Sequence, residues 1–469
     1  MPTSRSTTAK RIQRFRIGAA TALVALLLVS FVQVLAPAPN ADAATIRLAG
    51  ADRFSTNVAV SRTAPSFGGT VYLVSGAVFA DALPASALAA ADNGRLLLSR
   101  PDTIPAPITA EINRLRPSKI VLIGGLGALS SNVEAQARSF TSNVERIGGV
   151  DRVETSFLIF DRLRQIKPIT TIWVASGKTF PDALAASSVA GREGHAVLLW
   201  TNASNDYFRQ AVAARMNGVS TVYIAGGNAA IGSSTEQLFR PLGASSVRRF
   251  AGSDRFETAV LLHRALTPST RGSAIMLASG QEFPDALSAS VTAAQRGIPL
   301  YLTARNCATS NSVASEITRL RAQDTIVIGG DAAISQTAAL QLQCETPTTL
   351  KTRVFNETNA QRNNAGAGAL QQHEGLSRFA QNWADTIART GNVTHNPNLN
   401  ALSRSIGCTT WGENIAWTQN SQSPMSFWMG SAGHRANIVN ARFTQVGIGV
   451  ATASNGRTYW VMHFGACPR

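Results

Sequence analysis

"RLAGADRFSTNVAVS", residues 47–61, decides the fold, because the chain contains the same pattern twice more. "RIGGVDRVETSFLIF" occupies residues 146–160 and "RFAGSDRFETAVLLH" occupies residues 249–263. The copies lie about 100 residues apart, which is the size of a domain and well above the roughly 20 to 50 residues of a solenoid repeat. Each copy is therefore expected to bury a hydrophobic core of its own.

Two more motifs recur in every copy. "FADALPAS" begins at residue 79, "FPDALAAS" at 180 and "FPDALSAS" at 283. A glycine pair closes a later apolar run in each copy: Gly124-Gly125, Gly226-Gly227 and Gly329-Gly330. Short β-branched runs alternate with amphipathic stretches of helical length, which predicts an α/β fold with a parallel sheet and helices on both faces. The aspartates before the first helix of each copy are predicted N-caps: Asp52, Asp151 and Asp254.

In this order, the three motifs resemble the cell-wall-binding repeat type 2 family of bacterial surface proteins, over roughly residues 45–346. The resemblance implies three Rossmann-like domains packed as a pseudo-threefold trimer, and non-covalent attachment to an anionic cell-wall polysaccharide or teichoic-type polymer associated with peptidoglycan. Three arginines match the family motif and either face the polymer or pair with the capping aspartates: Arg53, Arg152 and Arg255. The glycine pairs are further polymer-binding candidates, because backbone amides at such turns can approach an anion; a purely structural turn explains them equally.

The N-terminus predicts a secreted protein. Five basic residues precede the apolar run 17–35, and Ala41-Asp42-Ala43 fits a cleavage site, so residues 1–43 are a predicted signal peptide. An uncleaved anchor is the alternative, since about twenty apolar residues can span a bilayer, but Pro37 and Pro39 favour removal. No later segment is apolar for long enough to span a membrane. The expected location is the cell wall or cell surface, and a surface-layer role stays open.

The chain is basic, with a formal net charge of +16. Residues 1–43 hold five basic residues and one acidic residue, so the remainder keeps +12. A basic protein outside a cell is drawn to polyanions such as wall polymers, lipid head groups or nucleic acid. Charge alone selects none of these, and no motif predicts a specific nucleic-acid partner.

Composition changes beyond the Pro/Thr-rich stretch at 344–351. The later landmarks are N359-x-x-R362, "THNP" at 394–397, "GENIAW" at 412–417, "SFWMGSAGHRANI" at 426–438 and "YWVMHFG" at 459–465. Together they resemble the bacterial form of the CAP superfamily, also called the SCP domain, over residues 352–469. The resemblance implies an αβα sandwich with a central antiparallel sheet and a polar cleft.

Two histidines and two acidic residues line the cleft of CAP proteins, and some members bind a divalent metal through the histidines. His395 and His434 match the histidines, Glu413 matches one acid, and Ser431 stands where the other is expected. If the three converge, they suit zinc, which would activate a water for hydrolysis with Glu413 as the catalytic residue. The missing acid counts against catalysis, so ligand binding or adhesion is predicted, with a metal-dependent hydrolase as the alternative and a scaffold role for Glu413 also open. Trp411 and Trp417 are predicted to pack in the core, and His463 is predicted to be a packed histidine.

Four cysteines without a CxxC pair agree with an oxidising compartment. Sequence does not determine their connectivity, but one pair falls on each side of Pro347, and we predict the bonds Cys307–Cys344 and Cys408–Cys467. The predicted domains are a signal peptide, three wall-binding repeats, a linker and a CAP domain, at 1–43, 44–145, 146–248, 249–346, 347–351 and 352–469.

Overall fold

The structure is a computed structural model that describes residues 44–200, 206–266, 274–419, 421–453 and 455–468. The signal peptide predicted for residues 1–43 lies outside the described residues. Within the described residues, no helix combines the length and the apolar composition needed to cross a membrane.

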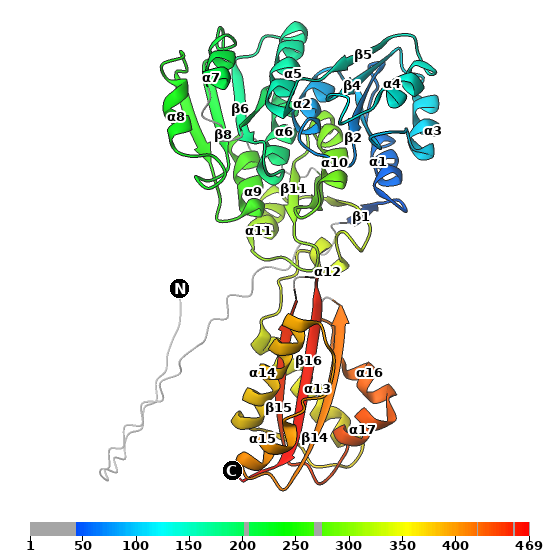
Figure 1. Cartoon of the computed structure of the whole chain (residues 1–469), viewed down its shortest axis with the longest axis vertical. Helices are drawn as coiled ribbons and strands as arrows, with labels where there is room; N and C mark the ends of the chain where they lie inside the picture. The colour runs from blue at the N-terminus through cyan, green and yellow to red at the C-terminus, as the bar shows by residue number, and fades with distance from the viewer. Residues whose placement is uncertain (1–43, 201–205, 267–273, 420, 454, 469) are drawn as a thin grey trace, which may run out of the picture. The chain divides into compact units, whose positions relative to one another are not determined.

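The repeats form three parallel sheets of four strands each, which confirms the predicted α/β class (Figure 1). The first sheet has the order β3-β2-β4-β5, with β2 Thr70–Ser75, β3 Arg95–Ser99, β4 Lys119–Ile123 and β5 Val144–Ile147. The second has the order β7-β6-β8-β9, with β6 Thr171–Ser176, β7 Ala196–Trp200, β8 Thr221–Ala225 and β9 Ser246–Phe250. The third has the order β11-β10-β12-β1, with β10 Ile275–Ser279, β11 Leu300–Thr303, β12 Asp324–Ile328 and β1 Ala44–Leu48.

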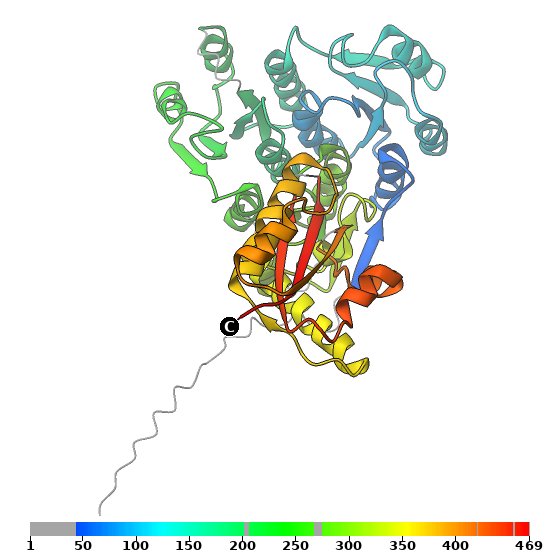
Figure 2. The same ribbon diagram turned by 60° about the horizontal axis from the view of Figure 1, so that its bottom comes forward.

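The last strand of each sheet comes from the motif that opens another sequence repeat. β5 ends in the motif of the second copy and β9 in that of the third. β1, the first described strand, pairs with β12, with Leu48 opposite Ile328. In Figures 1 and 2 the blue strand β1 accordingly lies beside the yellow-green elements of the third repeat. The three sheets are therefore linked in a closed ring, and their limits are offset by one strand from the sequence repeats.

Helices α1 Arg53–Ser61, α5 Arg152–Ile166 and α9 Arg255–Leu266 follow these strands. The predicted N-caps are confirmed, since each capping carboxylate accepts an amide hydrogen bond. Asp52 accepts from the amide of Ser55 at 2.7 Å, Asp151 from Glu154 at 2.9 Å and Asp254 from Glu257 at 2.8 Å.

Helices α2 Ala82–Ala91, α6 Pro181–Glu193 and α10 Phe283–Arg296 pack against one another in the middle of the repeats (Figure 1). Small residues permit the close approach: a Cβ added to Gly191 would lie 2.9 Å from the Cβ of Ala90 and 3.1 Å from that of Ala294. Beside these helices the phenylalanines of the three "F-x-D-A-L" motifs meet, with ring centroids 5.7 to 6.1 Å apart. One hydrophobic core thus contains residues of all three repeats, so the expectation that each copy buries a core of its own is wrong.

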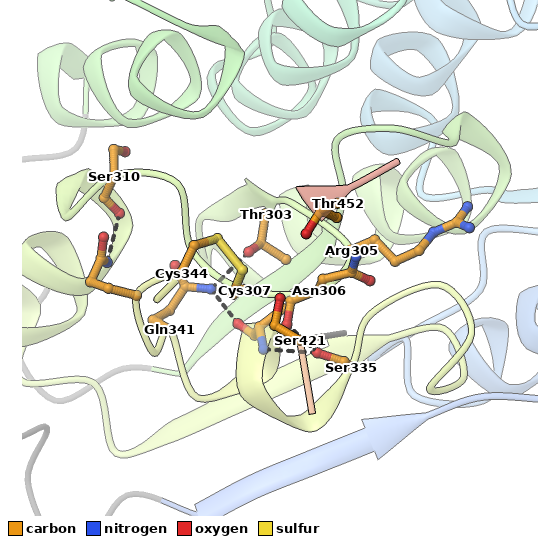
Figure 3. The surroundings of a disulfide bond; sticks show 12 residues. Thr303, Arg305, Asn306, Cys307, Ser310, Ser335, Gln341, Cys344, Ser421 and Thr452 are labelled. Carbon is orange, nitrogen blue, oxygen red and sulfur yellow. Dashed lines mark hydrogen bonds between the residues drawn. A yellow bond between two sulfur atoms is a disulfide. The ribbon is translucent and has the colours of Figure 1, made fainter. Parts of the chain in front are cut away.

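Shorter helices complete the repeats: α3 Ala106–Leu115, α4 Ser131–Arg138, α7 Asp206–Ala213, α8 Ser234–Phe239, α11 Ser312–Leu320 and α12 Gln336–Ala339. The predicted disulfide Cys307–Cys344 is present and joins the segment after β11 to the segment after α12 (Figure 3). Beside it, Gln341 Nε2 donates to Thr303 Oγ1 at 2.9 Å, and Ser335 Oγ donates to the Asn306 carbonyl oxygen at 2.6 Å.

The C-terminal domain is built on a sheet of order β13-β15-β16-β14. Its strands are β13 Gln371–Gln372, β14 Thr410–Gln419, β15 Gln445–Thr452 and β16 Arg457–Ala466, and its helices are α13 Pro347–Asn364, α14 Glu374–Thr390, α15 Leu399–Ser405, α16 Met425–Gly430 and α17 Ala432–Ile438. β14 and β15 run antiparallel to β16. The predicted αβα class is confirmed, and the disulfide Cys408–Cys467 is present.

Close packing of α14 on β15 explains two glycines of "GIGVA". A Cβ on Gly447 would lie 2.1 Å from the carbonyl carbon of Leu376, and a Cβ on Gly449 would lie 2.1 Å from the carbonyl oxygen of Ala380. No side chain fits at either position, so the helix backbone rests directly on the strand.

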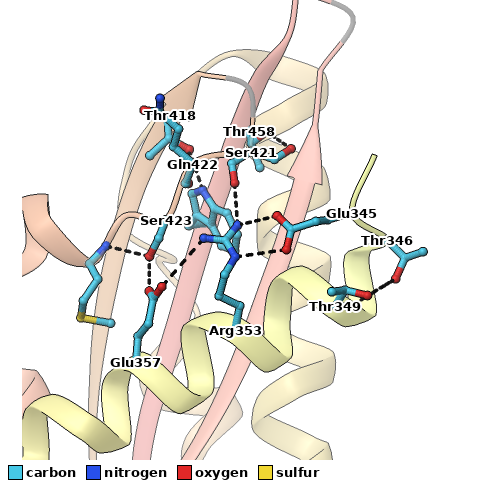
Figure 4. Close-up of polar contacts among 12 residues, drawn as sticks. Glu345, Thr346, Thr349, Arg353, Glu357, Thr418, Ser421, Gln422, Ser423 and Thr458 are labelled. Carbon is cyan, nitrogen blue, oxygen red and sulfur yellow. Dashed lines mark hydrogen bonds and ion pairs between the residues drawn. The ribbon is translucent and has the colours of Figure 1, made fainter. Parts of the chain in front are cut away.

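Residues 347–351, predicted as a linker, form the first turn of α13. The reason is local: Pro347 suits the first helical position, and the Thr346 hydroxyl accepts from the amide of Thr349 at 3.2 Å. Arg353 then fixes the start of this helix (Figure 4). Its guanidinium pairs with Glu345 at 2.9 Å and donates to the Ser421 carbonyl oxygen at 2.8 Å.

Candidate functional site

The arginines predicted to bind polymer occupy equivalent positions in the three repeats. Each donates one hydrogen bond to the carbonyl oxygen of a glycine that directly follows a strand, which is β2, β6 or β10. The bonds are Arg53 to Gly76 at 2.7 Å, Arg152 to Gly177 at 2.6 Å and Arg255 to Gly280 at 2.7 Å. Within the described residues, none of the three forms an ion pair with its capping aspartate. The side chains are exposed, so each guanidinium is oriented by a carbonyl and is still open to a ligand.

The glycine pairs divide into a buried first residue and a half-buried second one. Gly124, Gly226 and Gly329 have φ of +103°, +105° and +110°, a region that favours glycine. The amide of each first glycine donates to the strand of the next motif, for example Gly124 to Ile147 at 2.8 Å. These first amides are therefore engaged in the sheet, and the amides of Gly125, Gly227 and Gly330 are the ones left for an anion.

The carbonyl of each first glycine is held by the arginine that opens the next motif. Arg47 donates to Gly329 at 2.7 Å, Arg146 to Gly124 at 2.8 Å and Arg249 to Gly226 at 2.8 Å. These three arginines tie the last strand of each sheet, which comes from another sequence repeat, to the strand beside it. Their role was not separated from that of the second motif arginine in the sequence analysis.

A carboxylate lies against every first glycine. A Cβ on Gly124 would be 2.8 Å from Asp81 Oδ2, one on Gly226 would be 2.4 Å from Asp182 Oδ2, and one on Gly329 would be 2.5 Å from Asp285 Oδ2. Sequence analysis did not nominate these aspartates, although they stand in the most regular motif of the chain. Each aspartate lies where its own repeat meets the arginine of the next one: Asp81 near Arg152, Asp182 near Arg255 and Asp285 near Arg53. We call these three places the first, second and third junctions.

These aspartates begin helices but do not cap them. Among the described residues, neither Asp182 nor Asp285 has a hydrogen-bond donor. The Thr155 hydroxyl lies near Asp81, but it donates to the Asp151 carbonyl oxygen at 3.0 Å, and Asp81 Oδ1 is buried without a partner.

Burial raises the pKa of all three carboxyl groups. The next repeat's arginine opposes this effect for Asp182 and Asp285, and Thr155 followed by Arg152 opposes it for Asp81. For Asp285, burial and then the charge of Glu282 raise the pKa to about 6.

A cavity of about 310 Å³ opens at the third junction. Its polar lining comprises Asp52, Arg53, Thr56, Glu282, Asp285 and Arg305. Gly330 and small apolar side chains complete the wall. The cavity thus contains one residue of each predicted polymer-binding class, an arginine and a second glycine, together with the unpaired aspartate.

Glu413 is the centre of a hydrogen-bonded cluster with His395 and His463 in the C-terminal domain. Its Oε1 lies 2.6 Å from His395 Nδ1 and accepts from the amide of Asn396 at 3.0 Å, and its Oε2 lies 2.8 Å from His463 Nε2. Burial raises the pKa of Glu413, but the bond from His463, followed by those from His395 and Asn396, outweighs burial and lowers it. His463, predicted only as a packed residue, is fully buried and is a direct partner of the carboxylate. The pairing of β14 with β16 places His463 directly opposite Glu413, and this register is the feature from which the contact could have been predicted.

His434 lies on α17, with its ring centroid 5.6 Å from that of Phe427. Its Nδ1 is buried without a partner, and burial, followed by the charge of His395, lowers its pKa. Asn414 fixes this helix against β14, because its Nδ2 donates to the His434 carbonyl oxygen at 2.9 Å. Asn414 therefore has a scaffold role, and the bond from the Asn396 amide supports the scaffold role considered for Glu413.

The side chains around Glu413 fit a metal only in part. His395 and His434 offer imidazole nitrogens, and the unpartnered Nδ1 of His434 is an available donor. Both oxygens of Glu413 are taken up by other groups, and across the described part of the chain no three His, Cys, Asp or Glu side chains converge as ligands. Two imidazoles can hold a divalent cation when water or a ligand atom fills the remaining positions.

The prediction that Trp417 packs in the core is wrong. The side chain is 45% exposed, and the Arg457 guanidinium lies 4.3 Å from its ring centroid. Trp411 is half-buried under Arg404. Among the described residues of the C-terminal domain, the buried tryptophans are Trp428 on α16 and Trp460 on β16.

Comparison with known families agrees with this architecture. The model of cell wall binding domain 2 (CWB2) matches residues 47–134, 146–236 and 249–339. The chain belongs to the CWB2 family. The model of the cysteine-rich secretory protein family, CAP, matches residues 355–464. The CWB2 chain is therefore a cell-surface protein with three wall-binding repeats followed by a CAP domain.

Three proteins are similar to this chain in sequence or in structure. The chain is 26% identical over 308 residues to N-acetylmuramoyl-L-alanine amidase LytC of Bacillus subtilis (strain 168), which covers 66% of this chain and 60% of LytC. The structure of Cwp6 from Clostridium difficile matches with a TM-score of 0.59 and 28% identity, over 64% of this chain and 48% of Cwp6. Cwp8 from Clostridium difficile matches with a TM-score of 0.55 and 26% identity, over 62% and 50%. The chain thus spans about half to 60% of the length of these relatives.

Proposed function

We propose that the chain is secreted and held non-covalently on the cell wall by its three repeats, which bind an anionic wall polysaccharide or teichoic-type polymer associated with peptidoglycan. The observation that carries this proposal is the threefold recurrence of an exposed arginine oriented by a glycine carbonyl. An oriented guanidinium suits phosphate and carboxylate groups. Three sites that bind weakly one by one give strong attachment together.

The net charge supports the same proposal. A chain of +16 attracts polyanions over long range, and ions in solution screen this attraction. Attachment through the arginines should therefore weaken steeply as salt is added.

The test is a wall-binding assay with residues 44–469 and a variant in which Arg53, Arg152 and Arg255 are all changed to Gln. Retention at low salt is expected to fall by about tenfold or more, since each pair of charges at a surface contributes up to roughly 1 kcal/mol. The matched control changes three exposed arginines away from the junctions to Gln: Arg116, Arg296 and Arg321. Equal losses in the two variants would mean that the net charge of the chain, and not the three arginines at the junctions, causes retention on the wall.

We propose that the CAP domain contributes ligand binding or adhesion at the envelope. A general base at neutral pH needs a raised pKa and a free oxygen. Glu413 has a lowered pKa and hydrogen bonds on both oxygens, and Ser431 offers no second carboxylate. These properties of Glu413 favour ligand binding over a hydrolytic centre.

A metal-dependent hydrolase acting on wall or extracellular substrates is the second candidate, favoured by the free Nδ1 of His434 beside His395. His395 and His434 would hold the ion, which would supply an activated water. Calorimetric titration of zinc into residues 44–469 tests it. Stoichiometric binding at neutral pH that is lost in both His395→Ala and His434→Ala would support this candidate, and absence of binding would reject it.

A further inference from the structure

We propose that the cavity at the third junction binds the hydroxyl groups of a sugar ring, with the Asp285 carboxylate as the hydrogen-bond acceptor. This inference rests on the proposed wall binding and names the part of the wall polymer that the cavity recognises. Anionic groups of the polymer would contact arginines at the surface, and the sugar ring would enter the cavity.

The first argument is that the other charged groups of the cavity already have partners. Glu282 forms an ion pair with Arg305, Asp52 caps α1, and Arg53 donates to the Gly76 carbonyl oxygen. Asp285 alone among these five has no hydrogen bond to a described residue. Asp285 is half-buried and lines the open cavity, so its carboxylate is left to water or to a ligand, and a ligand that donates hydrogen bonds would take the place of that water.

The second argument is the sign of the charge. The lining contains three carboxylates, on Asp52, Glu282 and Asp285, against two guanidinium groups, on Arg53 and Arg305. A phosphate or carboxylate inside this cavity would face the Asp285 charge at short range, and like charges repel strongly where water is scarce. The unmet requirement of the cavity is therefore a hydrogen-bond donor, and an anion would not meet it.

The third argument is repetition. Asp81 and Asp182 occupy the same position as Asp285 at the other junctions, and each also lies against a glycine with positive φ without a donor of its own. One unpaired carboxylate could be an accident of packing. Three carboxylates at equivalent positions, each with a pKa that burial raises, point to a shared use.

The third junction differs from the others in a way that concerns the ligand. Glu282 precedes Phe283, whereas Val78 and Thr179 precede the equivalent phenylalanines. Glu282 and Arg305 add a polar rim to the cavity, while Pro284, Ala332 and Ala333 add small apolar walls. A sugar ring matches this combination, because its edge carries hydroxyl donors and its faces are apolar. The volume is at the lower end for small-molecule sites, which suits one or two sugar units.

The test measures retention of residues 44–469 on Bacillus subtilis walls at low salt and at high salt, where the attraction between exposed charges is screened. The native protein, Asp285→Asn and the control Asp102→Asn, which removes an exposed carboxylate, are compared. Asp285→Asn is expected to lose at least about tenfold of the retention at high salt, since it removes the charge and replaces one of the two accepting carboxylate oxygens by an amide group that donates. Asp102→Asn is expected to match the native protein. The melting temperature of Asp285→Asn is expected to be unchanged or higher.

Each result decides. Three results would overturn the inference. Asp285→Asn could retain within twofold of the native value at high salt, polyphosphate could displace the native protein at high salt, or the native protein could show no retention at high salt. If the native protein binds walls at neither salt concentration, the proposed anchoring itself fails. Loss of high-salt retention on walls stripped of anionic polymer would assign the sugar to that polymer, and persistence would assign it to the peptidoglycan glycan; both support a sugar site.

Discussion

Asp285→Asn should stabilise the fold at neutral pH. Burial, followed by the charge of Glu282, raises the pKa of Asp285 from its ordinary 3.8 to about 6, with Arg53 opposing the rise. The pKa difference corresponds to about 3 kcal/mol of folding free energy. This value is an upper limit, because part of the side chain is in contact with solvent.

The sign follows from the proton balance. Between pH 3.8 and about 6 the folded state keeps a proton that the unfolded state has released, so the free energy of unfolding falls as the pH rises through this window. Above pH 6 the full cost of the ionised carboxylate remains. Asparagine carries no charge, so Asp285→Asn should be more stable than the native protein at pH 7.5, by up to about 3 kcal/mol, and the difference should vanish near pH 3.8.

Urea unfolding of residues 44–469 at pH 7.5 and at pH 4, followed by tryptophan fluorescence, measures this difference. Asp102→Asn serves as the control, since it removes an exposed carboxylate and should change stability at neither pH. A loss of stability in Asp285→Asn at pH 7.5 would refute the reasoning, because it would show that the carboxylate has a stabilising partner in the folded protein.

Three further predictions concern buried polar groups. Glu316→Gln should cost about 1 to 3 kcal/mol in urea unfolding, because the fully buried carboxylate pairs with the partly exposed Arg264 and Arg319 at 2.5 to 2.6 Å and glutamine cannot neutralise them. No measurable change would contradict this account. Arg362→Met should destabilise the CAP domain by several kcal/mol, about 1 per lost bond, since Arg362 donates to four backbone carbonyl oxygens, and unchanged melting would contradict it. His463→Phe should raise the pKa of Glu413, because the hydrogen bond from His463 lowers that pKa. NMR of the Glu413 carboxyl carbon measures the change, and an unchanged or lower pKa would show that His463 is only packed.

The fold was largely predictable because its signals are local. The repeated motifs with their strand and helix patterns predict the parallel sheets, and the disulfide pairs lie within single domains. The ring closure through β1 has no local signal, because the paired residues Leu48 and Ile328 are 280 positions apart in the sequence. Turn and capping chemistry was read correctly at Asp52, where the partner is three residues away.

The candidate sites were less predictable because they depend on distant contacts. Sequence assigned Asp285 no binding role, since its proximity to Gly329 and Arg53 requires both the third sheet and the strand contributed by the first repeat. His463 was missed because its bond to Glu413 depends on the register of β14 against β16. Alternation alone cannot fix that register before the hairpin pairing is known.

The central claim is that the three repeats attach the chain to an anionic wall polymer, and retention on intact and polymer-stripped walls tests it most directly. Residues 44–469 should bind intact walls at low salt and lose at least about tenfold of that retention when the anionic polymers are removed, since the oriented arginines then lose their anionic partners. Equal retention on intact and stripped walls at low salt would contradict the claim.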